Sequence, residues 1–454
     1  MKKRIIGAGL LFAGVGAMAI GLLPQPSLLA AQARGGVVDV ADGAALQNAI
    51  MWARPGSTIR LADGEYPQLM INRDIDGAPI RITGSREARI NRMIFRKARN
   101  WRVDGITIVG GIGRAMPLDI GVSRNIMLTN VKLTGVTPDA GPRWEESNGV
   151  TIQASEHVVL ALSEATHVKQ IAGIRDSWGV VIEGNRFTNS REGLMVRATH
   201  GLMIRHNLFV GWEPRYEIHE HPDMIQFFTT QVPTGSSMVT IEGNYLSSGL
   251  DRNVQAIFIR AEAYESGKEP LGYHRDFTIR HNVYYGSSRH GISLSSVRGV
   301  VVENNTIIGS PHAFVGNVPR DPAGKSSTGW QPSIIASGVT WGRLSNNISA
   351  LMAIRAESIG TQDINNFVYK PRVLADGVNP GKTFPGPLTA GDLPLSAFAV
   401  RPQSENGKFG RGADITRVGP DAAIRDTEAL MREAIALADA ARKQDLTKDV
   451  PLPQ

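Results

Sequence analysis

A short strand pattern that ends in asparagine recurs through the middle of the chain, and its spacing restricts the possible folds more than any other feature. Each copy is an apolar or β-branched strand, a polar pair that ends in Asn, and a further apolar pair, as in "VVIEGNRF" and "LMIRHNLF". Two of the intervals are 22 and 23 residues, and the longer ones indicate loops inserted between repeats. The aligned asparagines are Asn185, Asn207, Asn244, Asn282, Asn305 and Asn347.

A second column of strands lies between these copies: "GVTIQA", "AGIRD", "GLMVRA", "DMIQFF", "AIFIRA" and "GISLSS". Its residues Gln153, Arg175 and Arg197 repeat every 22 positions, in step with the asparagine column. Two strand columns that share one period predict a solenoid, in which each coil buries its inner face against its neighbours. A β-sandwich also has many short strands, but it does not keep a fixed interval in two columns.

These repeats resemble the right-handed parallel β-helix proteins of the pectin-lyase-like superfamily, which includes pectate and alginate lyases. The asparagines resemble that superfamily's stacked Asn ladder, and "ALQNAIMWARPGSTIRLADGEYPQLMI" resembles its N-terminal capping helix and first strands. The resemblance implies an all-β fold, a single-stranded right-handed parallel β-helix. The same fold carries lyases, hydrolases, epimerases and adhesins, so the activity has to be argued from the site.

Three segments follow from these patterns. Residues 1–33 combine a basic start, an apolar run and the small-residue cleavage site Ala31-Gln32-Ala33, which predicts a cleavable signal peptide and a secreted or periplasmic protein. Residues 34–370 form the predicted β-helix domain. Residues 371–454 are predicted to be an irregular covering segment and a C-terminal capping helix, because "DAAIRDTEALMREAIALADAARK" has apolar residues at helical spacing.

Composition excludes several classes of protein. The chain has no cysteine, so no disulfide supports the fold. Its formal charge of +7 falls to +4 when Lys2, Lys3 and Arg4 leave with the signal peptide. This mild excess fits an anionic substrate, and no Lys/Arg run or aromatic stacking motif indicates nucleic acid. No segment after the signal peptide is long and apolar enough to cross a bilayer, and we expect a monomer.

Alternation of side chains along the second column predicts which of them face outward. Because neighbouring coils lie about 4.8 Å apart, equivalent outward residues form rows along the solenoid. One predicted row is Gln153, Arg175, Arg197, Phe228, Arg260 and Ser295, and a second is Asn148, Gln170, Glu192, Asp223, Gln255 and His290. Two long loops, "VGWEPRYEIHEHPD" and "AEAYESGKEPLGYHRD", are predicted to wall a groove at these rows.

The leading hypothesis is β-elimination on a polysaccharide that contains uronic acid, which requires a cation against the carboxylate, a base near C5 and an acid for the departing oxygen. We expect Arg197 and Arg260 to neutralise the carboxylate, with His221 as base and Tyr216 or His290 as acid. His219 is a further proton-transfer candidate. The residues expected to bind substrate are Arg175, Gln226, Phe228, Gln255, Gln153 and Tyr264. Tyr273 and His274 either close over the sugar or pack within their loop.

Glu192 and Asp223 leave other chemistry open. As neighbouring carboxylates they are candidate Ca²⁺ ligands, or the acid and nucleophile of a glycoside hydrolase. The sequence lacks the Lys/Arg motif of alginate lyases and the further aspartates of polygalacturonases. C5-epimerisation uses the same groups as the lyase reaction without breaking the chain. A non-catalytic polysaccharide-binding protein is the remaining alternative, which the cluster of acid and base groups disfavours.

Overall fold

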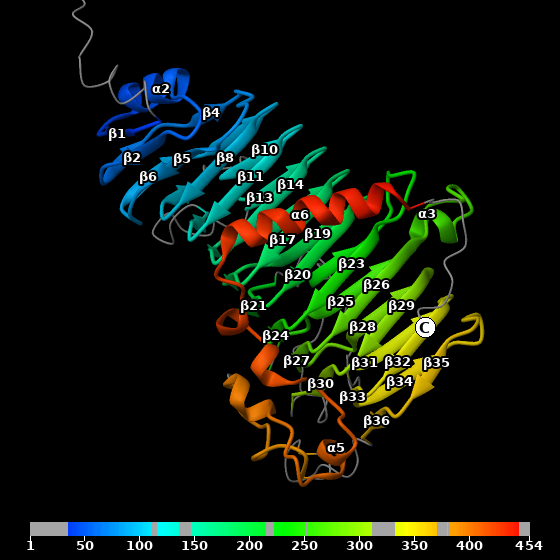
Figure 1. The fold of residues 1–454 in the computed structure, drawn as a ribbon. Helices are drawn as coiled ribbons and strands as arrows, with labels where there is room; N and C mark the ends of the chain where they lie inside the picture. Colours follow the sequence, from blue (N-terminus) through cyan, green and yellow to red (C-terminus); the bar gives the residue numbers. More distant parts are fainter. Residues whose placement is uncertain are drawn as a thin grey trace, which may run out of the picture.

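The computed structural model describes residues 35–110, 116–135, 147–214, 222–250, 252–310, 332–369, 379, 382–391 and 393–444. Its strands form three parallel sheets, which we name A, B and C. The first two strands both belong to sheet A, and from the second strand onward the chain passes through the sheets in the order A, B, C. The arrangement is the right-handed parallel β-helix expected from the repeat (Figure 1).

Each sheet takes one strand from successive coils. Sheet A contains β1 (Val37–Val40), β2 (Thr58–Leu61), β5 (Ile80–Thr83), β8 (Arg99–Asp104), β11 (Arg124–Thr129), β14 (Glu156–Ala161), β17 (Trp178–Glu183), β20 (His200–Arg205), β23 (Ser237–Glu242), β26 (His274–Arg280), β29 (Val297–Glu303), β32 (Thr340–Ser345) and β35 (Gln362–Ile364). Sheet B contains β3 (Gly64–Tyr66), β6 (Ala88–Asn91), β9 (Thr107–Val109), β12 (Lys132–Thr134), β15 (Glu164–Thr166), β18 (Arg186–Thr188), β21 (Leu208–Val210), β24 (Tyr245–Ser247), β27 (Val283–Gly286), β30 (Thr306–Gly309), β33 (Ile348–Ser349) and β36 (Phe367–Val368). Sheet C contains β4 (Leu69–Ile71), β7 (Met93–Arg96), β10 (Leu118–Gly121), β13 (Val150–Gln153), β16 (Gln170–Arg175), β19 (Glu192–Arg197), β22 (Asp223–Phe227), β25 (Gln255–Arg260), β28 (His290–Ser295), β31 (Ser333–Ser337) and β34 (Leu351–Ile354).

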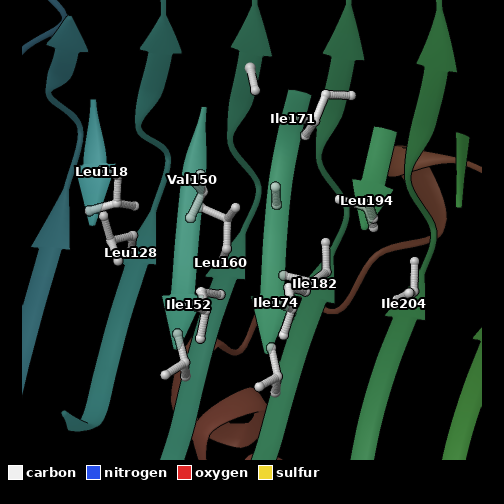
Figure 2. Close-up of a cluster of buried hydrophobic side chains, with 14 of the residues drawn as sticks. Leu118, Leu128, Val150, Ile152, Leu160, Ile171, Ile174, Ile182, Leu194 and Ile204 are labelled. Atoms are coloured by element: carbon white, nitrogen blue, oxygen red, sulfur yellow. The ribbon is translucent and has the colours of Figure 1, made fainter. Parts of the chain in front are cut away.

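The core runs along the axis of the solenoid. Inward side chains from the three sheets stack on the equivalent side chains of the next coil, as Val150, Ile152, Ile174 and Leu194 do in Figure 2. These four side chains are at most 1% exposed. A fully buried aliphatic side chain contributes about 1.5–3 kcal/mol of transfer free energy, so the repetition itself supplies the stability of the fold without disulfides.

The asparagine column forms the expected ladder at the turn between sheets A and B. The Oδ1 atom of Asn207 accepts hydrogen bonds from the backbone N–H and the side-chain amide of Asn185 at 2.9 and 3.0 Å. The same two bonds join Asn207 to Asn244, and so on through Asn347 to Asn366. The ladder gives buried turn groups partners that solvent cannot supply.

A second ladder stabilises the turn between sheets C and A. The backbone N–H of Ser155 donates to the hydroxyl of Ser177 at 3.3 Å, and that of Thr199 donates to Ser236 at 3.2 Å. The backbone N–H of Ser236 then donates to Nδ1 of His274 at 3.0 Å. Because burial lowers the pKa of His274 to about 4, this ring is a neutral acceptor within the ladder, and it lies at the start of a strand of sheet A and not in the loop before it.

The N-terminal coil is closed by α2 (Gly43–Trp52), as the resemblance implied (Figure 1). Asp42 caps this helix through a 2.8 Å hydrogen bond from the backbone N–H of Ala45, and Leu46, Ala49 and Ile50 are buried beneath it. A cap is needed because the first coil would otherwise expose its apolar core and an unpaired edge.

The C-terminal helix α6 (Thr427–Arg442) is present, but it does not cap an end. It lies along the outer face of sheet A over β11, β14, β17, β20 and β23 (Figure 1). Its buried side chains include Leu430, Met431 and Ala434, which pack on Val159 and Val181. Ion pairs hold it there: Arg102 with Glu428, Arg205 with Glu433, and Arg442 with Glu156. The helical pattern of the sequence alone did not predict these ion pairs with sheet A.

The preceding segment covers sheet B. Its described parts contain η6 (Leu395–Phe398), α5 (Glu405–Lys408), η7 (Ile415–Arg417) and η8 (Pro420–Ala422), and a short α3 (Glu262–Glu265) lies elsewhere, after β25. Phe384, Leu388 and Phe398 pack against Tyr245 and Tyr285, which point outward from sheet B. Helix α6 thus covers the outer face of sheet A from β11 to β23, and the segment covers part of the outer face of sheet B, whereas the described parts of both leave the outer face of sheet C uncovered. No described helix is long and apolar enough to cross a membrane.

Candidate functional site

The register of sheet C produces both predicted rows. Gln153 pairs with Arg175, Arg175 with Arg197, and the strand register continues this row to Phe228, Arg260 and Ser295. We call it the arginine row. Gln170 pairs with Glu192, and Asp223 pairs with Gln255. With Asn148 and His290 these residues form the amide–carboxyl row at the other edge of the sheet.

A groove lies on the outer face of β13, β16 and β19 between the two rows, with a volume of about 240 Å³. Five residues separate Glu192 from Arg197, so the rows stand roughly 16 Å apart along a strand. The middle of the floor was not identified from the sequence, although alternation places Thr151, Gly173 and Met195 there. The lining side chains and glycine are Asn148, Thr151, Gln153, Gln170, Gly173, Arg175, Met195, Arg197 and Phe228.

The three arginines of the row differ in their electrostatic state. Arg175 donates from Nε to its neighbour Asp176 at 2.8 Å. Arg260 donates from Nε to Glu265 of α3 at 2.9 Å, and Glu265 also accepts from Ser295 at 2.6 Å. The start of the second long loop therefore folds back and neutralises Arg260 through a carboxylate only five residues further along the chain.

Arg197 differs from the other two arginines of the row because it has no ion-pair partner in the described part of the chain. Its guanidinium lies 5.0 Å from the centre of the Phe228 ring, and no described carboxylate forms an ion pair with it. Burial and the nearby charge of Arg175 lower the pKa of Arg197 from its usual range. A partly desolvated cation beside a like charge is stabilised by any anion that enters the groove.

Glu192 and Asp223 form a carboxyl pair in the amide–carboxyl row, beside the groove but not among the residues that line it. The backbone N–H of Asp223 lies 3.5 Å from Oε2 of Glu192. Burial raises the pKa of Glu192 to about 7 against the opposing charges of Arg191 and Lys169. Burial, and then the charge of Glu192, raises the pKa of Asp223 well above its usual range. Near neutral pH the pair therefore holds at least one proton.

Two neighbouring acceptor atoms at this edge have no hydrogen-bond partner among the described residues. They are Oδ1 of Asp223, whose side chain is 2% exposed, and Oε1 of Gln255 on the next coil. Buried oxygens normally have partners, so both atoms are positioned for a donor or a cation.

His290 completes the amide–carboxyl row one coil beyond Gln255. Its Nδ1 lies 2.6 Å from the hydroxyl of Ser293, and its ring meets Phe258 edge-on at 5.5 Å. Burial lowers the pKa of His290 to about 4, so the ring is neutral near pH 7 and lacks the imidazolium proton that the expected acid role requires. It stands three coils from Arg197, outside the groove.

Two of the remaining predicted residues, Gln226 and Tyr264, lie outside both rows. Gln226 points outward between Met195 and Phe258. Tyr264 is 37% exposed on α3 and contacts the buried Tyr273 ring at 5.5 Å, so the second loop packs these two tyrosines together. Tyr216, His219 and His221 lie outside the described residues.

A larger cavity of about 380 Å³ lies at the corner between sheets B and C, against the C-terminal covering segment. Trp212, Glu213 and Arg252 are among its lining residues. It shares no residue with the groove and contains no described histidine or residue with a shifted pKa. The groove on sheet C is therefore the stronger candidate for chemistry.

No protein family matches the chain by sequence, and no curated protein does. Among solved structures, a surface adhesin of Streptococcus pneumoniae is similar at 12% identity over 72% of this chain and 82% of the other, with a TM-score of 0.42. A PL6 family alginate lyase is similar at 15% identity over 86% of this chain, with a TM-score of 0.43, and this chain spans 58% of its length. A mannuronan C-5 epimerase module of Azotobacter vinelandii is similar at 14% identity over 72% of this chain and 94% of the other, with a TM-score of 0.44. At these low sequence identities, the similarities bear on the fold of this chain and not on its activity.

Proposed function

We propose that this protein is a secreted carbohydrate-active enzyme that cleaves an acidic polysaccharide by β-elimination in the groove on sheet C. The observation that carries the proposal is Arg197, a partly buried cation in the groove without an ion-pair partner among the described residues. The carboxyls of Glu192 and Asp223, whose pKa values are raised, lie in the row at the other edge of sheet C. The signal peptide of residues 1–33 and the monomeric state remain predictions.

The guanidinium of Arg197 supports the first requirement of the reaction. A uronate C5 proton becomes acidic only when the adjacent carboxylate is neutralised, and a guanidinium binds a carboxylate through two parallel hydrogen bonds. Arg175 lies one coil away and extends the positive edge of the groove. Because Glu265 already holds Arg260, we now assign neutralisation to Arg197 rather than to both arginines.

Proton transfer is assigned to the residues proposed from the sequence. His221 and Tyr216 keep their proposed roles as base and acid, and His219 remains a further candidate. Glu192 is an additional base, because a carboxyl whose pKa is about 7 is half ionised at neutral pH. Gln153, Phe228, Gln226, Gln255 and Tyr264 remain proposed contacts for neighbouring sugar rings.

Calcium is a proposed cofactor of the carboxyl pair. Glu192, Asp223 and Gln255 provide oxygen atoms, which Ca²⁺ prefers, and two of these oxygens lack partners. No group of three or more acidic or histidine ligands occurs within the described ranges, so any such site is completed by amide oxygens and water. Bound Ca²⁺ supplies positive charge that favours the ionised form of both carboxyls.

The test offers the purified mature protein a panel of uronic acid polymers while ultraviolet absorbance and reducing ends are followed together. A lyase produces unsaturated uronates, so both signals rise. If reducing ends rise without absorbance, β-elimination is wrong. If neither signal appears on any polymer, cleavage is wrong, and a change in C5 configuration would indicate an epimerase.

The carboxyl pair specifically favours a second candidate, glycoside hydrolysis. Glu192 and Asp223 occupy adjacent coils, a spacing of about 5 Å that suits a retaining mechanism. One protonated and one ionised carboxyl is the state that such an enzyme needs. Reducing ends without absorbance, lost in Asp223→Asn, would support this candidate.

A further inference from the structure

Gly173 occupies the centre of the groove floor. It pairs with Thr151 on one side and Met195 on the other, and both neighbours carry outward side chains. Gly173 is the position in this middle row, from Thr151 to Phe258, that contributes no side chain. The groove floor therefore has no side chain at this point, between Thr151 and Met195.

The backbone does not require glycine at this position. Gly173 is absent from the residues with positive φ, so an L-residue fits its conformation. An added Cβ would meet one group, Nε2 of Gln170 at 2.9 Å, which is the end of a flexible side chain. Gly193 is different, because its Cβ would lie 1.9 Å from the backbone oxygen of Met224. Backbone packing therefore requires glycine at position 193, whereas no backbone contact requires glycine at position 173.

The two edges beside Gly173 have different chemistry. Asn148 and Gln170 present side-chain amides that make no hydrogen bond among the described residues, and such amides both donate and accept. Arg175 and Arg197 present guanidinium groups at the other edge. A ring that carries hydroxyls on one side and a carboxylate on the other matches this arrangement.

We propose that Gly173 is the seat of one uronate ring, whose carboxylate points to Arg197 and whose hydroxyls point to Asn148 and Gln170. The polymer then runs along the solenoid axis, across the strands. This inference rests on the proposed acidic substrate, but it concerns binding and not cleavage.

The test compares Gly173→Val with Gly121→Val by measuring affinity for alginate and polygalacturonate by calorimetry. Gly121 is the matched control, since it is also an outward glycine of sheet C without positive φ, and the three atoms nearest to its Cβ would belong to the flexible side chain of Arg96. We expect Gly173→Val to weaken binding by about tenfold or more, through lost contacts with the seated ring, while Gly121→Val binds as wild type does. Thermal melting of both variants checks that they fold.

A second arm uses the same polymers after their carboxyl groups have been reduced to primary alcohols. We expect wild-type binding to weaken by about tenfold, because the charged contact with Arg197 is lost. If Gly173→Val binds within twofold of wild type, or if reduced polymers bind equally well, the proposed seat is wrong. If the wild type binds neither polymer, it is also wrong. Binding that responds as expected without cleavage overturns the lyase proposal and leaves the seat intact.

Discussion

Replacing Asn207 with alanine tests whether the asparagine ladder stabilises the solenoid. Asn207 is fully buried, and its Oδ1 accepts from two donors of Asn185 while its Nδ2 donates to Ile182 and Asn244. The alanine variant leaves both Asn185 donors and the Ile182 oxygen without these partners, in a place that water does not reach. At about 1–2 kcal/mol for each of these three groups, the free energy of unfolding should fall by roughly 3–6 kcal/mol.

The matched control is Asn366→Ala at the last rung of the ladder. Asn366 accepts the same two hydrogen bonds from Asn347, at 2.8 and 2.9 Å, but it is only partly buried. Water replaces part of what is lost there, so we expect a decrease of about 1–2 kcal/mol. A ladder that contributes nothing beyond packing would make the two variants equal.

Urea unfolding measures this difference, followed by far-ultraviolet circular dichroism and by tryptophan fluorescence. Two signals are needed because repeat proteins can unfold in parts. If Asn207→Ala is destabilised by less than about 1 kcal/mol, or by no more than Asn366→Ala, the hydrogen-bond reasoning is refuted.

Three further outcomes follow from the charges. Arg197→Gln should lower kcat/KM on a uronic acid polymer by about ten- to a hundredfold. Arg260→Gln should lower it by less than about fivefold, because Arg260 is already paired with Glu265. Steady-state kinetics measures both values, and equal losses would contradict the assignment to Arg197. Because the folded pKa of Glu192 is raised to about 7, wild-type stability should fall by roughly 3 kcal/mol as pH rises from 4 to 8, and urea unfolding of Glu192→Gln should show a smaller fall. Burial would raise the pKa of Glu242, but its hydrogen bond and charge pairing with Arg280 and the charge of Arg417 lower it overall. The ionised Glu242 therefore stabilises the fold at neutral pH, and this contribution is lost on acidification below the usual glutamate range. If the melting temperature of Glu242→Gln falls as steeply as that of the wild type between pH 6 and 3, this reasoning is wrong.

The sequence by itself determined the periodic part of this protein. The shared 22-residue interval and the alternation along "GVTIQA" and "GLMVRA" were sufficient to place Gln153, Arg175 and Arg197 in one row. A strand that buries one face has a single acceptable register, and a solenoid repeats it, so local patterning fixes the long-range order.

Only the tertiary structure decided which of these residues are available for chemistry. Arg197 and Arg260 are equivalent in the sequence pattern, but the loop that carries Glu265 returns to one and not to the other. The protonation of Glu192 and Asp223 likewise depends on how much solvent the folded coils exclude. Desolvation depends on contacts between coils that are distant in sequence, and the pairing of Arg260 with Glu265 depends on the path that the loop takes after the strand, so the strand period encodes neither.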